Sequence, residues 1–472
     1  MFVGREAELA TLDRLYRKKG FQMVVIYGRR RVGKTTLIDR FVHGKPTLYF
    51  TAQQKSSLQN LALFSQAVYE LFGIPSETGA FASWDAALRF VAQQAKQAPM
   101  PLIFVFDEFP YAAEADPALP SALQVAIDHE FKGTDATMIL CGSNEGFMES
   151  DVLERKSPLY GRRTAQMKLR PLDYLDAARM IPKASTLDLV RYYATFGGTP
   201  YYVEQIDDER SYEENVADLL FDISGLLYEE PLMLLRQELR EPALYNSILD
   251  ALGTGATKPK EIAEKAGVDR ASMSKYLRTL EGLGLVRKEL PFGDNPLTSR
   301  KGLYKLADPL FSYWYRFVSA SIGAIENGAG ATIAATKASG SNLATYVGMQ
   351  FEAISCQWVA RQSAAGKLPF IATAFGKWWG SDPLGKCEAD IDVIAACKEE
   401  GQLLAGECKW REEFDESAAL ATLERRAALI KGYDQVTYAL FAKHPFSPST
   451  RRKARERHDV LLVDADELYA SA

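Results

Sequence analysis

The feature that most constrains this chain is a glycine-rich loop that directly follows a short β-branched run near the N-terminus. The run Gln22–Tyr27 (QMVVIY) predicts a buried strand, and apolar spacing over 35–42 predicts a helix. Between them, GRRRVGKT at 28–35 fits the pattern G-x-x-x-x-G-K-[ST]. Glycines let backbone N–H groups surround phosphate oxygens, and the start of a helix adds its positive dipole end. The sequence therefore predicts a strand–loop–helix unit that binds a nucleoside triphosphate.

The residues of this loop have expected roles in binding ATP together with Mg²⁺. Lys34 would reach the β- and γ-phosphates, and the Thr35 hydroxyl would ligate Mg²⁺. The remaining residues of the predicted nucleotide site are Gly28, Arg29, Arg30, Arg31, Val32, Gly33 and Thr36.

A second acidic motif supports hydrolysis as well as binding. Leu102–Phe106 is an unbroken apolar run, typical of a strand buried in a parallel sheet, and Asp107 and Glu108 follow it directly. We expect Asp107 to hold the magnesium shell and Glu108 to polarise the attacking water, because a second carboxylate is available as a base. The competing interpretation is a strand that ends in two solvated acids.

Further polar residues follow the next strands. After the run 137–141, Ser143 and Asn144 are equal candidates for sensing the γ-phosphate. Arg162 and Arg163 stand beside Gly161, and either could act as an arginine finger in the same chain or on a neighbouring copy. The competing interpretation is that both are surface arginines.

Length and pattern divide the 472 residues into several expected domains. Strands alternate with helices over the first two hundred residues, which favours a doubly wound α/β domain, and the pattern then becomes mostly helical. We expect a P-loop ATPase domain at 1–206, a helical lid or connector at 207–245, and a winged helix-turn-helix at 246–318. The stretch 319–341 is rich in small residues and predicts a linker or a small-residue helix, and 342–472 returns to mixed α/β.

Several motifs together resemble the prokaryotic ATPases of the AAA/STAND-related group, also described as archaeal and bacterial DEXX-box-type ATPases. They are FVGRE (2–6), GRRRVGKTTL (28–37), FVFDEF (104–109), CGSN (141–144), SPLYGRR (157–163) and FGGTPYY (196–202). The resemblance covers about the first half of the chain. It implies an α/β ATPase core with a helical lid, and a Gly-Gly-x-Pro stretch (197–200) near the nucleotide.

The segment 257–286 predicts a helix-turn-helix followed by a wing. Its apolar residues would form a small core, and Gly267 permits the tight turn between the two helices. The runs 285–290 and 303–306 would form a two-stranded wing. The second helix is expected to expose residues suited to phosphate and base-edge contacts, namely Arg270, Ser272, Ser274, Lys275 and Arg278. Winged helices also serve as spacers and protein-docking modules, so DNA contact is one of two interpretations.

Acidic residues converge in the C-terminal third. Residues 386–395 and 402–410 read as strands, and because side chains alternate along a strand, Glu388, Asp390 and Asp392 share one face. Glu407 and Lys409 share a face of the other strand. If the strands pair, several carboxylates meet, and a divalent cation would relieve their repulsion. We expect Asp392 and Glu407 to ligate that metal and Lys409 to orient or activate water.

These residues, with Glu352 on a preceding helix as a further expected ligand, resemble the PD-(D/E)xK nuclease-like fold. GKWW (376–379) and GECKW (406–410) also resemble the nuclease-like C-terminal domain common in this ATPase family. The resemblance covers about 342 to the end and implies a restriction-endonuclease-like α/β domain with Mg²⁺ or Mn²⁺. Ile391 replaces the proline of the pattern, which leaves activity open. The competing interpretations are solvated acids and a nuclease-like fold without hydrolysis.

Two functions therefore compete. The first is an ATPase coupled to a metal-dependent nuclease acting on DNA or RNA, and the second is an ATP-driven switch whose other domains bind partners without cleavage. The basic stretch 451–457 could track a phosphate backbone or be a solvated helix end. A net charge of −5, five cysteines without a C-x-x-C pair and no membrane-length apolar run lead us to expect a cytoplasmic protein outside the membrane. Homo-oligomerisation is a further expectation.

Overall fold

The computed structural model describes residues 2–75, 79–383 and 385–470. The chain forms two compact units. Unit 1 comprises Met1–Pro171 with Thr199–Tyr201, and unit 2 comprises Leu172–Gly198 with Tyr202–Ala472. Among the described residues, none of the helices has both the length and the apolar character needed to cross a membrane.

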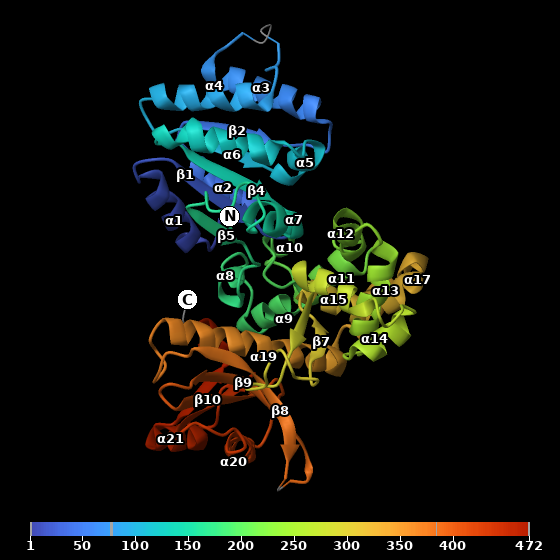
Figure 1. Cartoon of the computed structure of the whole chain (residues 1–472). Helices are drawn as coiled ribbons and strands as arrows, with labels where there is room; N and C mark the ends of the chain where they lie inside the picture. Colours follow the sequence, from blue (N-terminus) through green and yellow to red (C-terminus); the bar gives the residue numbers. More distant parts are fainter. Residues whose placement is uncertain (1, 76–78, 384, 471–472) are drawn as a thin grey trace. The chain divides into compact units, whose positions relative to one another are not determined.

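Unit 1 is built on a five-stranded parallel sheet (Figure 1). Its strand order is β2-β3-β4-β1-β5. The strands are β1 (Gln22–Tyr27), β2 (Thr47–Thr51), β3 (Ile103–Asp107), β4 (Thr137–Gly142) and β5 (Ala165–Lys168). The helices of this unit are α1 (Glu6–Tyr16), α2 (Lys34–Val42), α3 (Ser57–Phe72), α4 (Trp84–Gln97), α5 (Phe109–Ala115), α6 (Leu119–His129) and α7 (Glu145–Phe147).

Both faces of this sheet are covered, which explains why β1 is apolar at every position after Gln22. Met23 and Val25 belong to the core formed with α3, α4, α5 and α6. Val24 and Ile26 point to the opposite face, into the core formed with α1 and α2. The predicted doubly wound α/β domain is confirmed, and it brings the carboxyl ends of β1, β3 and β4 to one edge.

Unit 2 begins with helices and continues through the winged helix. The helices around and within this part are α8 (Tyr174–Ala178), α9 (Thr186–Phe196), α10 (Pro200–Val203), α11 (Tyr212–Leu220), α12 (Glu230–Glu238), α13 (Pro242–Gly253), α14 (Pro259–Ala266), α15 (Met273–Gly282) and α16 (Pro309–Tyr313). Strands β6 (Val286–Glu289) and β7 (Leu303–Leu306) pair antiparallel as the predicted wing. Gly267 ends α14 in the left-handed conformation at φ 66°, as the tight turn requires.

The C-terminal part of unit 2 contains a second five-stranded sheet, of order β12-β11-β10-β9-β8. Strands β8, β9 and β10 are antiparallel, whereas β10, β11 and β12 are parallel. The strands are β8 (Ala374–Asp382), β9 (Cys387–Cys397), β10 (Gln402–Lys409), β11 (Gln435–Ala442) and β12 (Val460–Asp464). The helices are α17 (Ile322–Ala324), α18 (Gly330–Lys337), α19 (Gly340–Ala364), α20 (Glu416–Ala427), α21 (Pro448–Arg457) and α22 (Ala465–Tyr469). Much of the stretch 319–341 is therefore helical.

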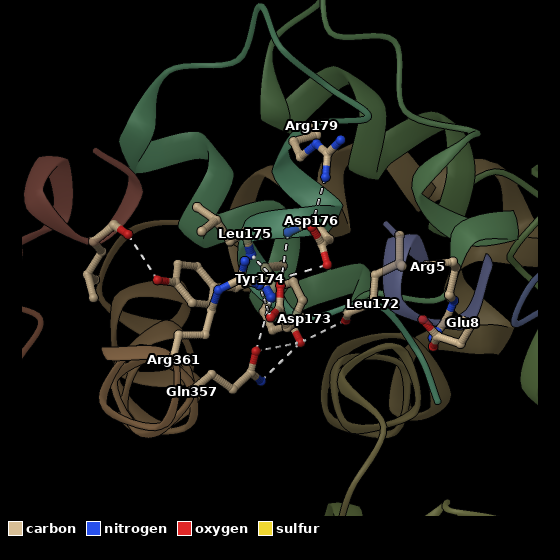
Figure 2. A network of polar contacts seen from close by, with 12 residues as sticks. Arg5, Glu8, Leu172, Asp173, Tyr174, Leu175, Asp176, Arg179, Gln357 and Arg361 are labelled. Atoms are coloured by element: carbon tan, nitrogen blue, oxygen red, sulfur yellow. Dashed lines mark hydrogen bonds and ion pairs between the residues drawn. The ribbon is translucent and has the colours of Figure 1, made fainter. Parts of the chain in front are cut away.

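Several sets of contacts join distant segments of unit 2. Figure 2 shows one set, in which Arg361 of α19 pairs with Asp173, and Gln357 accepts a hydrogen bond from the Tyr174 backbone N–H at 3.0 Å. Another set ties the winged helix to the C-terminal sheet. The backbone N–H of Phe292, just after β6, donates to the carbonyl oxygen of Lys377 in β8 at 2.7 Å, and its ring packs on the sheet core.

Candidate functional site

The phosphate loop of unit 1 has a backbone that its glycines make possible. Gly28 has φ 150°, and a Cβ there would lie 2.3 Å from the carbonyl oxygen of Leu169, so a side chain is excluded. Gly33 has φ 88° and stands immediately before α2. The Nζ of Lys34 donates to the carbonyl oxygens of Gly28 (2.7 Å) and Arg29 (3.1 Å), which holds the ammonium inside the loop. Thr35 is exposed at the first turn of the helix.

The three arginines of the loop contact other parts of unit 1. Arg29 is buried and donates to the Thr199 hydroxyl at 3.0 Å, and Arg30 donates to the Tyr111 hydroxyl at 2.5 Å. Arg31 lies over the Tyr201 ring, 4.3 Å from its centroid. These contacts bring 199–201 against the loop, in keeping with the expectation for the Gly-Gly-x-Pro stretch. Val32 is fully buried, and Thr36 is exposed.

Asp107 and Glu108 lie at the same edge of the sheet, because β4 separates β1 from β3 and all three strands are parallel. The Tyr49 hydroxyl donates to Asp107 at 3.1 Å, and burial, together with the charge of the Asp107 carboxylate, raises the pKa of Tyr49. Burial and the charge of Asp107 also raise the pKa of Asp39 in α2.

Ser143, which follows β4, donates hydrogen bonds to the Glu108 carboxylate. Its hydroxyl lies 2.8 and 2.9 Å from the two carboxylate oxygens, and its backbone N–H donates at 3.3 Å. Glu108 itself adopts a left-handed conformation with φ 47°, which is uncommon outside glycine. Of the two sensor candidates, Ser143 therefore contacts the expected base. Asn144 is exposed and directly precedes α7. Its Oδ1 accepts a hydrogen bond from the Phe147 backbone N–H in that helix.

The assignment of Arg162 or Arg163 as an arginine finger stays a prediction. Arg162 and Arg163 precede β5, whose first residue Ala165 pairs with Val24 near the start of β1. Both backbones therefore lie toward the edge opposite the phosphate loop, which follows the end of β1. Arg162 forms an ion pair with Asp128 at 2.5 Å, and hydrogen bonds from Arg162 and Lys132 lower the pKa of Asp128 to about 2.

The C-terminal strands pair as expected and bring the acidic residues together. The ladder between β9 and β10 ends at Val393 and Gly406, so Asp392 and Glu407 lie beside each other just past it. The Cys408 backbone N–H donates to Asp392 at 2.9 Å. Burial, together with the charges of Glu352 and Glu407, raises the pKa of Asp392 to about 7.

Cations of the protein itself neutralise two of these carboxylates. Glu352 pairs with Lys377, and Glu407 pairs with Lys409. Burial alone would lower the pKa of Lys377, but the interaction with Glu352 raises it. Arg426 of α20 adds a 3.7 Å ion pair to Glu407. Glu407 is 7% exposed, and its Oε2 has no hydrogen-bond partner within the described residues. In the part of the chain that the structure describes, no group of three or more acidic, His or Cys side chains is arranged to hold a metal. The expected three-carboxylate ligand set is not formed while these ion pairs are closed.

The helix-turn-helix places its polar residues on the surface, with one correction. Arg270 and Ser272 do not belong to the second helix, because α15 begins at Met273. Arg270, Ser274, Lys275 and Arg278 are all exposed, and Arg278 donates to the Ser274 carbonyl oxygen at 3.2 Å.

Sequence reasoning missed several residues of these sites. Tyr49 was missed because its place beside Asp107 depends on β2 pairing with β3, which the sequence does not state. Arg426 lies in α20, seventeen residues after Lys409, and no motif surrounds it. Lys377 lies within the GKWW motif, so the sequence drew attention to this residue. The motif did not indicate that Lys377 pairs with Glu352.

A parallel sheet with a glycine-rich loop after β1 and acidic residues after β3 defines the class of the first unit as a P-loop ATPase domain. Consistent with this, residues 2–206 match the model of an ATPase domain predominantly from Archaea. Residues 247–290 match the IclR helix-turn-helix domain, and 314–421 match a domain of archaeal and bacterial proteins of unknown function. The chain thus contains a P-loop domain similar to this ATPase domain and a segment similar to the IclR helix-turn-helix.

A relative that spans nearly the whole chain and solved structures that cover part of it are also found. An uncharacterised protein from Methanocaldococcus jannaschii is 28% identical over 99% of this chain and 100% of its own length. Among solved structures, a Walker-type ATPase of Pyrococcus abyssi is 18% identical, with a TM-score of 0.49 over 67% of this chain and 96% of that one. The ORC1 protein of Aeropyrum pernix, solved in complex with DNA, is 14% identical, with a TM-score of 0.36 over 69% and 95%.

Proposed function

We propose that the protein hydrolyses ATP with Mg²⁺ at the edge of unit 1 formed by the phosphate loop, Asp107 and Glu108. The observation that carries this proposal is the Glu108 carboxylate bonded by Ser143 beside Asp107, at the edge where β1 delivers Lys34. Lys34 would bind the β- and γ-phosphates. Mg²⁺, held by Thr35 and Asp107, would neutralise phosphate charge.

The carboxylate of Glu108 is suited to take a proton from water. The water oxygen forms a bond to the γ-phosphorus as the bond from that phosphorus to the β–γ bridging oxygen breaks. The proton passes to Glu108 and ADP leaves. Asn144 is proposed to contact the γ-phosphate through its side-chain amide, and Arg162 or Arg163 to act as an arginine finger in the same chain or on a neighbouring copy.

Two variants test the proposal. Lys34→Ala should lose nucleotide binding, measured by calorimetry with ATP and Mg²⁺, because its ammonium is the principal phosphate contact. Glu108→Gln should bind ATP but release phosphate at least about a hundredfold more slowly than the wild type. Turnover by Glu108→Gln at the wild-type rate would refute the base assignment. Glu130→Gln, an acid in the same unit away from the loop, is the matched control.

We propose as a second function that the acidic centre of unit 2 hydrolyses phosphodiesters of nucleic acid. The buried Oε2 of Glu407 without a hydrogen-bond partner, beside Asp392 and Lys409, supports this proposal. Asp392 and Glu407 would hold Mg²⁺ or Mn²⁺, which would stabilise charge on the phosphate. Lys409 would orient a water whose oxygen bonds to phosphorus while the bond to the leaving oxygen breaks, and the proton that the water loses ends on the leaving oxygen. The exposed side chains of the helix-turn-helix would contact DNA.

Plasmid incubation with Mn²⁺ separates this second function from its competitor, an ATP-driven switch that binds partners without cleavage. The wild type should cut and Lys409→Ala should not, while Lys431→Ala, a lysine outside the centre, should cut normally. Equal degradation by wild type and Lys409→Ala would mean contamination. Intact plasmid in every sample, with ATP turnover retained, would favour the switch.

A further inference from the structure

A cavity of about 470 Å³ lies within unit 2 between the winged helix and the acidic centre. Its walls include residues of α13 and α19, among them Glu352, as well as residues of the wing region and the C-terminal sheet. The wing and the segment after it contribute the cations Arg287, Lys305 and Arg316, and the C-terminal sheet contributes Trp379, Asp390 and Asp392. The hydrogen bond from Phe292 to Lys377 joins the wing region to the sheet.

The volume limits what can enter. A cavity of 470 Å³ is equivalent to a cube with an edge of about 8 Å, since the cube root of 470 is near that value. This lies within the usual range of small-ligand pockets, about 300 to 1,000 Å³. A duplex does not fit, because a base pair together with its two sugar–phosphate backbones is much wider than this edge. A single nucleotide is of suitable size.

The sheet wall offers a flat apolar surface next to the carboxylates. Trp379 pairs with Asp390 across β8 and β9, so its ring lies on the same face as Asp390 and Asp392. Its neighbour Trp378 pairs with Ile391 and packs against the core of the sheet, and both of these residues also line the cavity. Trp379 is half-buried and makes no contact with another ring within the described residues. An unstacked tryptophan at a cavity wall is the kind of surface on which bases stack.

The wing side supplies positive charge for a phosphate. Arg316 lies 5.8 Å from the Tyr346 ring centroid and forms no ion pair within the part of the chain described. Arg287 and Lys305 share Glu289, at 2.7 Å each. Burial would raise the pKa of Glu289, but these two cations outweigh it and lower the pKa to about 2. Three cations against one carboxylate leave this wall positive.

We propose that this cavity binds one unpaired nucleotide of a nucleic-acid strand, with its base on Trp379 and its phosphate on Arg316. The inference rests on the proposed nuclease function and specifies its substrate, because a strand reaches the acidic centre through this cavity only where it is unpaired. The wing thereby serves as a wall of the substrate site.

Binding without cleavage tests the proposal. Full-length protein in EDTA is titrated into a fluorescein-labelled oligothymidylate of twelve nucleotides, and into a duplex of equal length, with anisotropy as the readout. The single strand should bind at least about tenfold more tightly than the duplex. Trp379→Ala should weaken single-strand binding by about five- to a hundredfold, the range for loss of one stacked base, and Trp379→Phe should restore most of it. Arg316→Ala should weaken it by about three- to tenfold.

The controls are Phe375→Ala, an exposed aromatic residue of the same strand outside the cavity, and Arg155→Ala, an exposed arginine of unit 1. Both should bind like the wild type. Equal affinity for strand and duplex, or unchanged binding by Trp379→Ala, would overturn the proposal. So would displacement of the strand by thymidine monophosphate at equal nucleotide concentration, because the ligand would then be a free nucleotide.

The same set of variants distinguishes this inference from the nuclease proposal. Binding that depends on Trp379, with no cleavage by any variant, would refute the nuclease and leave the cavity assignment standing. Cleavage that depends on Lys409, with binding indifferent to Trp379, would do the opposite.

Discussion

The two acidic regions of the molecule hold their carboxylates in different ways. At the ATPase edge, Asp107 and Glu108 accept hydrogen bonds from neutral donors, Tyr49 and Ser143. Neither acid forms an ion pair within the described residues. In the C-terminal centre, Glu352 and Glu407 are paired with Lys377 and with Lys409.

The two regions therefore differ in the source of the positive charge that balances their carboxylates. Neutral donors orient a carboxylate but leave its charge uncompensated, so the ATPase edge is ready to accept a cation. Ion pairs compensate the charge in advance, and an incoming cation must displace a lysine or arginine. We therefore expect substitutions at the first region to affect turnover, and substitutions at the second to affect stability.

The largest expected effect is at the ATPase edge. Asp107→Asn keeps an acceptor for Tyr49 but removes the charge, so ATP turnover should fall at least about a hundredfold while the unfolding temperature stays within about 2 °C. Phosphate release and thermal unfolding measure the two quantities. A variant that unfolds well below the wild type would mean that the charge of Asp107 is structural, and the contrast between the regions would fail.

Lys377→Met should show the reverse pattern. It leaves Glu352 largely buried without its partner, and we expect a loss of about 2 to 3 kcal/mol of unfolding free energy. Differential scanning calorimetry should show the loss in unit 2. Millimolar Mn²⁺ should recover more stability in this variant than in the wild type, because the cation replaces the lysine. Lys301→Met, at an exposed ion pair, should cost less than about 0.5 kcal/mol, and a similar loss in both would contradict the argument.

Asp392→Asn should stabilise the protein in a pH-dependent way. The folded pKa of about 7 lies above that of an ordinary aspartate, so the folded protein binds the proton more tightly than the unfolded chain. Protonated Asp392 therefore makes its full contribution to the unfolding free energy of the wild type below about pH 4. This contribution is lost as the pH rises toward 7. In EDTA, the variant should gain about 1 to 2 kcal/mol at pH 8 and little at pH 4.5. A gain independent of pH would rule out titration of Asp392 as its cause.

The smallest effect is expected at Arg162. Arg162→Ala removes a partly exposed ion pair with Asp128, so stability should fall by about 1 kcal/mol or less. In dilute protein, ATP turnover should not change. A loss of turnover that grows with protein concentration would indicate a neighbouring copy in the site, and a loss at every concentration would contradict the placement of this arginine.

Sequence patterns were most informative where a local motif determines the backbone. The strand–loop–helix around Gly28 and the wing strands follow from apolar periodicity and glycine placement. Asp107 and Glu108 could be placed at the same edge as Lys34 because strand ends in parallel sheets share an edge.

What the sequence could not provide was the partner of each charged side chain. The Arg162–Asp128 pair depends on α6 lying beside the start of β5, and the Glu352–Lys377 pair on how α19 crosses the second sheet. Such pairs join residues far apart in the chain, and a charged residue alone does not show whether it faces a ligand or a partner. The chain direction of β5 determines where the backbones of Arg162 and Arg163 lie, and only strand pairing reveals it.

The backbone hydrogen bond between Phe292 and Lys377 limits where the protein can be cut into separate fragments. A fragment that starts at the C-terminal sheet would lose the ring that packs on that sheet, and a fragment ending after the wing would expose it. Modules that exchange freely between proteins usually meet at polar, weakly packed boundaries. Here recombination or cloning at the boundary would remove part of a core. The helix-turn-helix and the second sheet are therefore expected to be inherited, expressed and lost as one piece.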